Sequence, residues 1–222
     1  MASFGYNVHI LISTLPVFAQ CALVTLELTV VAIFIGLLLG LLLALGRLSR
    51  NAAAKKLAGI YVWFFRGSPL LLQIMFLYFG LPMIWPKLSL PMFPSGFIAL
   101  GLNSAAYLAE IIRAAIQSID KGQMEASRAL GMGYGQAMRR IIIPQSYRRL
   151  IPPVGNEFIA LLKDSSLVSA MGLTELMRKT TVLSNGTGNA VYYLPCIVFY
   201  LAMTTLFTFV FGKLEKKYSV YE

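Results

Sequence analysis

Long runs of apolar residues set the class of fold that this chain can adopt. The stretch LVTLELTVVAIFIGLLLGLLLALG has a single charged residue in 24 positions, and a helix that crosses a bilayer needs about 20 mostly apolar residues. Over the 222 residues, 58% are hydrophobic and 13% are charged, whereas soluble domains carry about 25% charged residues. We therefore expect an all-α integral membrane bundle that forms one transmembrane domain over residues 1–222.

Five stretches are apolar enough to be membrane spans. The first is long enough to tilt or to extend past the bilayer. The second has the least defined boundaries, because RGSP separates it from another apolar stretch at 57–65, and Pro69 suits the first turn of a helix. The expected spans are about 17–45, 70–84, 93–118, 153–171 and 192–211.

The basic residues are distributed unevenly between the two sides of these spans. Fourteen of the 19 Lys and Arg residues lie before the second span, between the third and fourth, or after the fifth, and two lie within spans. The other side has Lys87, Arg178 and Lys179. Because cytoplasmic loops are enriched in Lys and Arg, we expect the N-terminus outside and the C-terminus in the cytoplasm. This asymmetry accounts for the net charge of +10 without nucleic acid as a partner.

The loop between the third and fourth spans, at about 120–150, is long enough to have structure of its own. It contains EASRALGMGYGQAMRRIIIP, residues 125–144. Helix formers precede Gly131, which can end a helix, and a second helical stretch at 136–143 is interrupted by Pro144. Such a segment can lie on anionic lipid headgroups or dock into another protein, and the physical properties of its residues leave both uses open.

This loop resembles the EAA---G---------I-LP motif of ABC importer permeases. Ser replaces the third-position Ala and Ile replaces the Leu before Pro, while the spacings are those of the motif. The resemblance covers the whole chain, with RGSPLLLQ at the second span and a basic C-terminus, and is greatest to permeases for polar amino acids. The matching positions in the loop are Glu125, Ala126, Ser127, Gly131, Ile141, Ile143 and Pro144.

The resemblance implies a type I ABC importer-like bundle in which this loop is the coupling helix. In that family the helix sits in a cleft on a separate ATPase, so Glu125, Ala126, Ser127 and Gly131 are the expected coupling positions. ATP and Mg would bind to the partner ATPase, and no cofactor is expected here, since the sequence has no GxxxxGK[ST] phosphate loop. The implied partners are an ATP-binding-cassette ATPase dimer, a second permease copy or a paralogue, an extracytoplasmic amino-acid-binding protein and membrane lipid. The implied location is the bacterial inner or plasma membrane.

Polar side chains within the third and fourth spans are the candidates for a substrate site, because ionisable residues in a membrane are usually functional or paired. Asn103, Tyr107 and Glu110 share one helical face. Glu157 and Asp164 share a face of the fourth span, and Glu110 and Glu157 are expected at similar depths, near the place where alternating-access transporters bind substrate.

Structural roles are open for the same residues. Glu110 can neutralise Arg113 three residues later, and a buried Asn103 can bond two helices together. Lys163 and Asp164 can form ion pairs that hold spans together.

A polar, basic amino acid is the predicted substrate. If Arg113 and Lys163 are paired locally, one carboxylate remains for a cationic side chain, and GNEF, which contains Glu157, resembles permeases of basic amino acids. A permease for glutamine or another polar amino acid is the alternative. An ion-coupled secondary transporter that uses Glu110 and Glu157 is the rival of another class, although five spans without an internal repeat disfavour it. No catalytic or metal-ligating constellation supports an enzyme, since the chain has one His.

Overall fold

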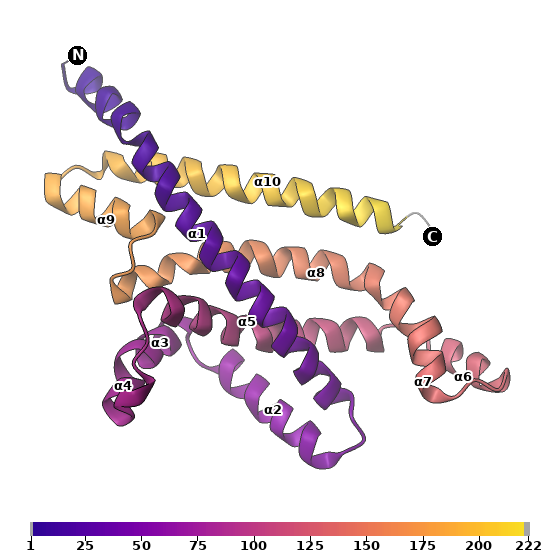
Figure 1. Cartoon of the computed structure of the whole chain (residues 1–222). Helices are drawn as coiled ribbons and strands as arrows, with labels where there is room; N and C mark the ends of the chain where they lie inside the picture. Colours follow the sequence, from indigo (N-terminus) through magenta and orange to yellow (C-terminus); the bar gives the residue numbers. More distant parts are fainter. Residues whose placement is uncertain (1, 220–222) are drawn as a thin grey trace.

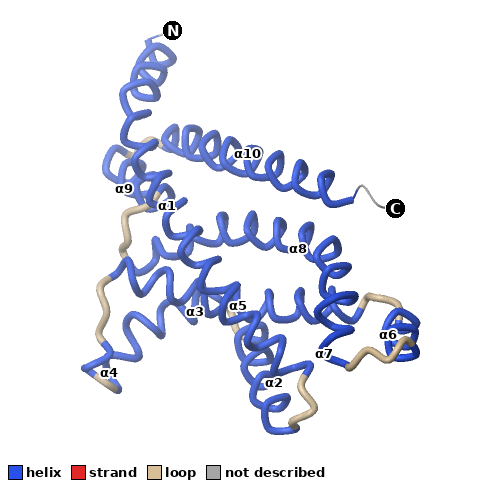
Figure 2. Tube along the Cα trace, turned by 45° about the vertical axis from the view of Figure 1, so that its right-hand side comes forward, coloured by secondary structure: helices blue, strands red, loops and turns tan. Residues whose placement is uncertain are grey.

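The computed structural model describes residues 2–219, in which helices are joined by short loops and turns and no strand occurs (Figures 1 and 2). α5, α8 and α10 lie side by side in that order, and α1 crosses them diagonally (Figure 1). The α-helices are α1 (Ala2–Leu48), α2 (Ala52–Gly67), α3 (Leu70–Met75), α4 (Leu81–Ile84), α5 (Met92–Gln117), α6 (Lys121–Ala129), α7 (Tyr134–Ala137), α8 (Ile143–Asp164), α9 (Leu176–Thr187) and α10 (Tyr193–Ser219). Short π-helical turns at Phe76–Gly80 and Met138–Ile142, and 3-10 turns at Pro86–Leu88, Ser165–Met171 and Ala190–Tyr192, connect them.

Three helices of the described chain are long and apolar enough to cross a membrane by themselves. They are Ile12–Leu48, Met92–Gln117 and Ala190–Tyr218, and they coincide with the first, third and fifth expected spans. Hydropathy locates these helices well because each is one long apolar run.

The second expected span is the second part of a bent pair of helices. α2 and the segment Leu70–Ile84 together are apolar enough to cross, and they are bent by 104° at the break. The residue before a proline avoids the helical conformation, which explains why α2 ends just before Pro69. Arg66, which was counted among the basic residues before the second span, therefore lies near the end of the first helix of this pair and not in a connecting loop.

The fourth expected span begins ten residues too late. α8 starts at Ile143 and contains Pro152 and Pro153 in its interior, and it is not among the helices that are apolar enough to cross alone. Pro144 does not interrupt the loop helix as predicted: it lies in the first turn of α8, where its missing N–H costs little. The π turn at Met138–Ile142 joins α7 to α8 without a break.

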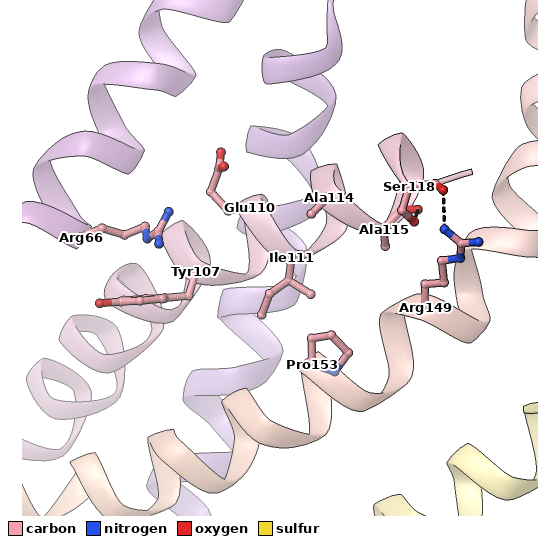
Figure 3. A pocket seen from close by; sticks show the side chains of 9 residues that line it. All are labelled: Arg66, Tyr107, Glu110, Ile111, Ala114, Ala115, Ser118, Arg149 and Pro153. Carbon is pink, nitrogen blue, oxygen red and sulfur yellow. Dashed lines mark hydrogen bonds between the residues drawn. The ribbon is translucent and has the colours of Figure 1, made fainter. Parts of the chain in front are cut away.

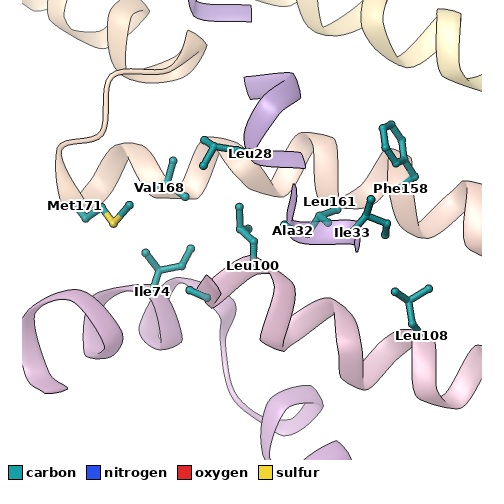
Figure 4. Close-up of a cluster of buried hydrophobic side chains, with 11 residues drawn as sticks. Leu28, Ala32, Ile33, Ile74, Leu100, Leu108, Phe158, Leu161, Val168 and Met171 are labelled. Atoms are coloured by element: carbon teal, nitrogen blue, oxygen red, sulfur yellow. The ribbon is translucent and has the colours of Figure 1, made fainter. Parts of the chain in front are cut away.

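Glycines allow α1 and α5 to pack closely. A Cβ atom at Gly40 would lie 2.9 Å from Leu108 Cβ and 3.1 Å from the Ala105 carbonyl oxygen, and one at Gly36 would lie 3.1 Å from Leu108 Cδ1. Small residues four apart are a common way for membrane helices to approach. The core beside this contact gathers fully buried side chains from α1, α3, α5 and the turn after α8, among them Leu28, Ile74, Leu100 and Val168 (Figure 4).

Gly40→Val is expected to destabilise the chain strongly, because backbone atoms of α5 must move to admit the side chain. Overpacking typically costs about 1–3 kcal/mol. The measurement is the fraction of detergent-solubilised protein that stays monodisperse after stepwise heating. Gly212→Ala in α10 is the control, since nothing lies within 4 Å of a Cβ there; equal losses for both variants would show that the α1–α5 contact is not tightly packed.

Candidate functional site

A cavity of about 490 Å³ opens beside the second half of α5, between the end of α2 and α8 (Figure 3). Of the sequence-predicted substrate residues, Tyr107 and Glu110 line it. Asn103, Glu157 and Asp164 are not among its lining residues. The cavity is lined by Arg66, Tyr107, Glu110, Ile111, Ala114, Ala115, Ser118, Arg149 and Pro153.

Glu110 is held by two arginines. Arg113 Nη2 lies 2.6 Å from Glu110 Oε2, and Arg47 Nε of α1 lies 3.2 Å from Glu110 Oε1. The structure thus contains the Glu110–Arg113 pair that the spacing of three residues suggested, and it adds a partner from another helix. Figure 3 shows the Glu110 carboxylate turned away from Ile111 and Pro153. Its negative charge is therefore compensated within the chain.

Asn103 braces the break in the second span. Its Nδ2 donates to the carbonyl oxygen of Phe65 at 3.1 Å and to Gln73 Oε1 at 2.9 Å. Gln73 Nε2 in turn donates to the carbonyl oxygens of Phe65 and Ser68, at 2.9 and 3.0 Å. A helix end in a membrane needs such partners, because its last carbonyls have none within the helix. Gln73 was not among the residues expected at the site, although a lone amide in RGSPLLLQ was the available signal.

Glu157 occupies a different environment from Glu110. Its Oε1 accepts a hydrogen bond of 2.7 Å from Ser104 Oγ, which joins α8 to α5. Among the side chains that the structure describes, the ion pairs all involve Glu110, so none of these side chains lies within ion-pair distance of Glu157 as a cationic partner. Asp164 is exposed at the C-terminal end of α8, beside the exposed Lys163.

Glu175 is a buried acidic residue that sequence analysis did not single out. It is 0% exposed and caps α9, where its carboxylate accepts from the N–H groups of Met177 and Arg178 at 2.8 and 2.7 Å. It also accepts from Tyr200 Oη of α10 at 3.3 Å and from Thr25 Oγ1 of α1 at 3.5 Å. Burial raises the pKa of the Glu175 carboxyl, and these hydrogen bonds partly offset that rise. The carboxylate thus ties three helices together.

The predicted coupling loop folds as a helix with a defined beginning and end. Asp120 Oδ1 accepts from the Gly122 N–H at 2.6 Å and caps α6. Gly131 has φ +82°. Its N–H donates to the Arg128 carbonyl at 2.9 Å, and the Met132 N–H donates to the Ser127 carbonyl at 3.1 Å. These two bonds form a Schellman motif, which needs a left-handed residue at the position of Gly131.

The positions expected to couple the ATPase differ in their exposure. Glu125, Ala126 and Gly131 are exposed. Ser127 is 4% exposed, and its hydroxyl donates to the Gln123 carbonyl at 2.6 Å. α6 lies at one end of the molecule, beyond the last residues of α5 and the first of α8 (Figure 1). Its outer face is thus free to meet another protein.

Comparisons with known proteins agree with this architecture. Residues 36–220 match the family described as binding-protein-dependent transport system inner membrane component. The chain is 39% identical over 209 residues to the arginine transport system permease protein ArtQ of Bacillus subtilis (strain 168), covering 93% of this chain and 94% of that protein. It is 35% identical over 207 residues to the glutamine transport system permease protein GlnP of Escherichia coli (strain K12), with the same coverage.

Solved structures share the fold. A chain in the crystal structure of an amino acid ABC transporter with histidines superposes with a TM-score of 0.88 at 39% identity, covering 93% of this chain and 96% of that one. An inward-facing structure of the MetNI methionine ABC transporter gives a TM-score of 0.79 at 21% identity, covering 93% and 98%. The second match supports the fold alone.

Proposed function

Since the chain belongs to the family of binding-protein-dependent transport system inner membrane components, and is a permease subunit of an ABC importer for polar amino acids rather than an enzyme, we propose that it carries a basic amino acid. The observation behind this choice is the environment of Glu157. Its carboxylate lies in α8 with one hydroxyl as its hydrogen-bond donor, whereas Glu110 is neutralised by Arg47 and Arg113.

A cationic substrate side chain would give Glu157 the partner that the chain itself does not supply. An ionised carboxylate in a low-dielectric environment is costly unless it is paired. The similarity to an arginine permease supports this choice, and the similarity to glutamine permeases keeps glutamine as the second candidate. In the reconstituted complex, arginine, lysine or histidine should stimulate ATP hydrolysis more than glutamine. A larger response to glutamine would decide for the second candidate.

The proposed assembly contains two permease chains and two ATPases. The α8 face that carries Asn156, Lys163 and Asp164 is exposed in the single chain, and polar side chains of a membrane helix usually face protein or a water-filled path. This supports a second copy of the chain, or a paralogue, against that face. The sequence offers no phosphate loop, so ATP and Mg would bind to the ATPases, which the exposed residues of α6 would contact. An extracytoplasmic binding protein would deliver the amino acid.

We propose the orientation with the α6 loop in the cytoplasm of a bacterial cell and α9 outside its inner membrane. With Arg66 assigned to the bent pair of helices, thirteen Lys and Arg residues remain on the side of α6, against three on the side of α9. This excess is the pattern of cytoplasmic loops.

Cysteine labelling tests this orientation. A cysteine at Asn185 is expected to react with a membrane-impermeant thiol reagent in intact cells, and one at Gln136 only after the cells are permeabilised. Both positions are exposed, and the native Cys21 and Cys196 are buried, so the background should be low. The reverse pattern would place α6 outside and would rule out its contact with an ATPase.

A further inference from the structure

Arg66 lies within the pair of helices that together are apolar enough to cross a membrane. It follows Ala52, the first residue of α2, by fourteen positions, which is roughly 20 Å along the helix. It stands next to the 104° bend between the two helices of this pair. Arginines in this position are rare and are usually paired or part of a transport path.

Arg66 forms no ion pair with the side chains that the structure describes. The guanidinium carbon lies 5.2 Å from the centroid of the Tyr107 ring, a cation–π contact. Arg47 and Arg113 both form ion pairs with Glu110. Glu110 and Glu157 lie within range of the Arg66 charge, but neither is within ion-pair distance of it.

The cavity beside Arg66 is suited to an anionic group attached to a small molecule. Its volume of about 490 Å³ is in the range of small-molecule sites, and Ile111 and Pro153 give it an apolar wall. Figure 3 shows Arg66 and Tyr107 at one end and Arg149 at the other. Arg149 donates to the Ser118 carbonyl, and the negative charge of Glu110 is already neutralised. Arg66 is therefore the cation available to a ligand at its end of the cavity.

We propose that Arg66 binds the α-carboxylate of the transported amino acid. A guanidinium matches a carboxylate with two parallel hydrogen bonds, and the Tyr107 ring holds the guanidinium at the edge of the cavity. This inference rests on the proposed function as an amino-acid path. It does not depend on whether the side chain is basic, because every amino acid carries this carboxylate.

Analogues that lack the α-carboxylate test its contact with Arg66 directly. The permease–ATPase complex in nanodiscs, without the binding protein, is titrated with arginine and agmatine, and with glutamine and 4-aminobutanamide. In the pair whose amino acid the complex transports, the wild-type complex should bind the amino acid roughly 10- to 150-fold more tightly than the analogue. This is the range for a charge-assisted hydrogen bond. Arg66→Gln should bring the ratio of the two affinities close to one, because it should weaken binding of the amino acid and not of the analogue. Arg149→Gln, at the other end of the cavity, should leave the ratio unchanged.

Arg66→Lys is the second test variant, in case Arg66→Gln does not assemble. Lysine keeps the charge but lacks the planar pair of donors, so the ratio should fall severalfold. An unchanged ratio in either Arg66 variant would overturn the proposal, as would equal binding of amino acid and analogue by the wild type. A wild-type complex that binds no amino acid of either pair, yet takes up amino acids when the binding protein is added, would overturn the Arg66 site alone. Absence of both binding and uptake would overturn the proposed function.

Discussion

Gly131→Arg should abolish most ATP-driven transport while the chain still inserts into the membrane. Gly131 has φ +82°, where a residue with a Cβ costs about 1–2 kcal/mol. The Schellman bonds from Gly131 and Met132 end α6 beside the residues expected to meet the ATPase. A variant that cannot form this turn should present Glu125 and Ala126 in another geometry, so we expect transport to fall by at least about tenfold.

Gly133→Arg is the matched control, because it adds the same side chain two residues away. Gly133 has φ −67°, and nothing lies within 4 Å of a Cβ at either glycine. Co-purification of the ATPase and uptake in proteoliposomes are the two measurements. If both variants lose the ATPase equally, the added charge and not the turn is responsible. If Gly131→Arg transports normally, α6 is not the coupling helix.

Glu157→Gln should reduce the ATPase response to basic amino acids roughly 10- to 150-fold. The response to neutral amino acids should stay nearly unchanged. The substitution removes the charge while keeping most of the volume and an acceptor for Ser104 Oγ. The expected loss is that of one charge-assisted hydrogen bond. Substrate-stimulated ATP hydrolysis with arginine, lysine, histidine and glutamine measures it.

Glu110→Gln is the comparison variant and should behave differently. It leaves Arg47 and Arg113 without their carboxylate, and an unpaired charge in a partly buried site destabilises the fold. The yield of folded protein should therefore fall, with no preference among substrates. If the Glu157 variant responds to all four amino acids as the wild type does, Glu157 is a packing residue, and the proposed basic specificity loses its main support.

The sequence predicts the parts of the fold that depend on one long apolar run. The helices at Ile12–Leu48, Met92–Gln117 and Ala190–Tyr218 follow from hydropathy alone. The bent pair of helices around RGSP does not, because RGSP indicates a helix break without showing that the apolar residues on both sides belong together. For this reason Arg66, which lies in α2, was counted with the loop before the second span. The start of α8 was missed because its first half carries Arg148 and Arg149 and two internal prolines.

The candidate site shows the same division between local and tertiary information. The Glu110–Arg113 pair follows from a spacing of three residues on a helix. Its third member, Arg47, comes from α1 and is placed only by the packing of α1 on α5. The bonds of Asn103 to Gln73 and to the end of α2 likewise depend on the 104° bend. Glu175 has a local signal, an acidic residue just before a helix, but its contacts with Tyr200 and Thr25 are tertiary.

The most direct test of the proposed function is uptake of labelled amino acids by proteoliposomes that contain this chain, its ATPase and the binding protein, with ATP enclosed. We predict that arginine accumulates only when ATP and the ATPase are present, that ionophores do not abolish uptake, and that lysine or histidine competes better than glutamine. Uptake driven by a proton or sodium gradient without the ATPase, or a clear preference for glutamine over arginine, would contradict the proposal.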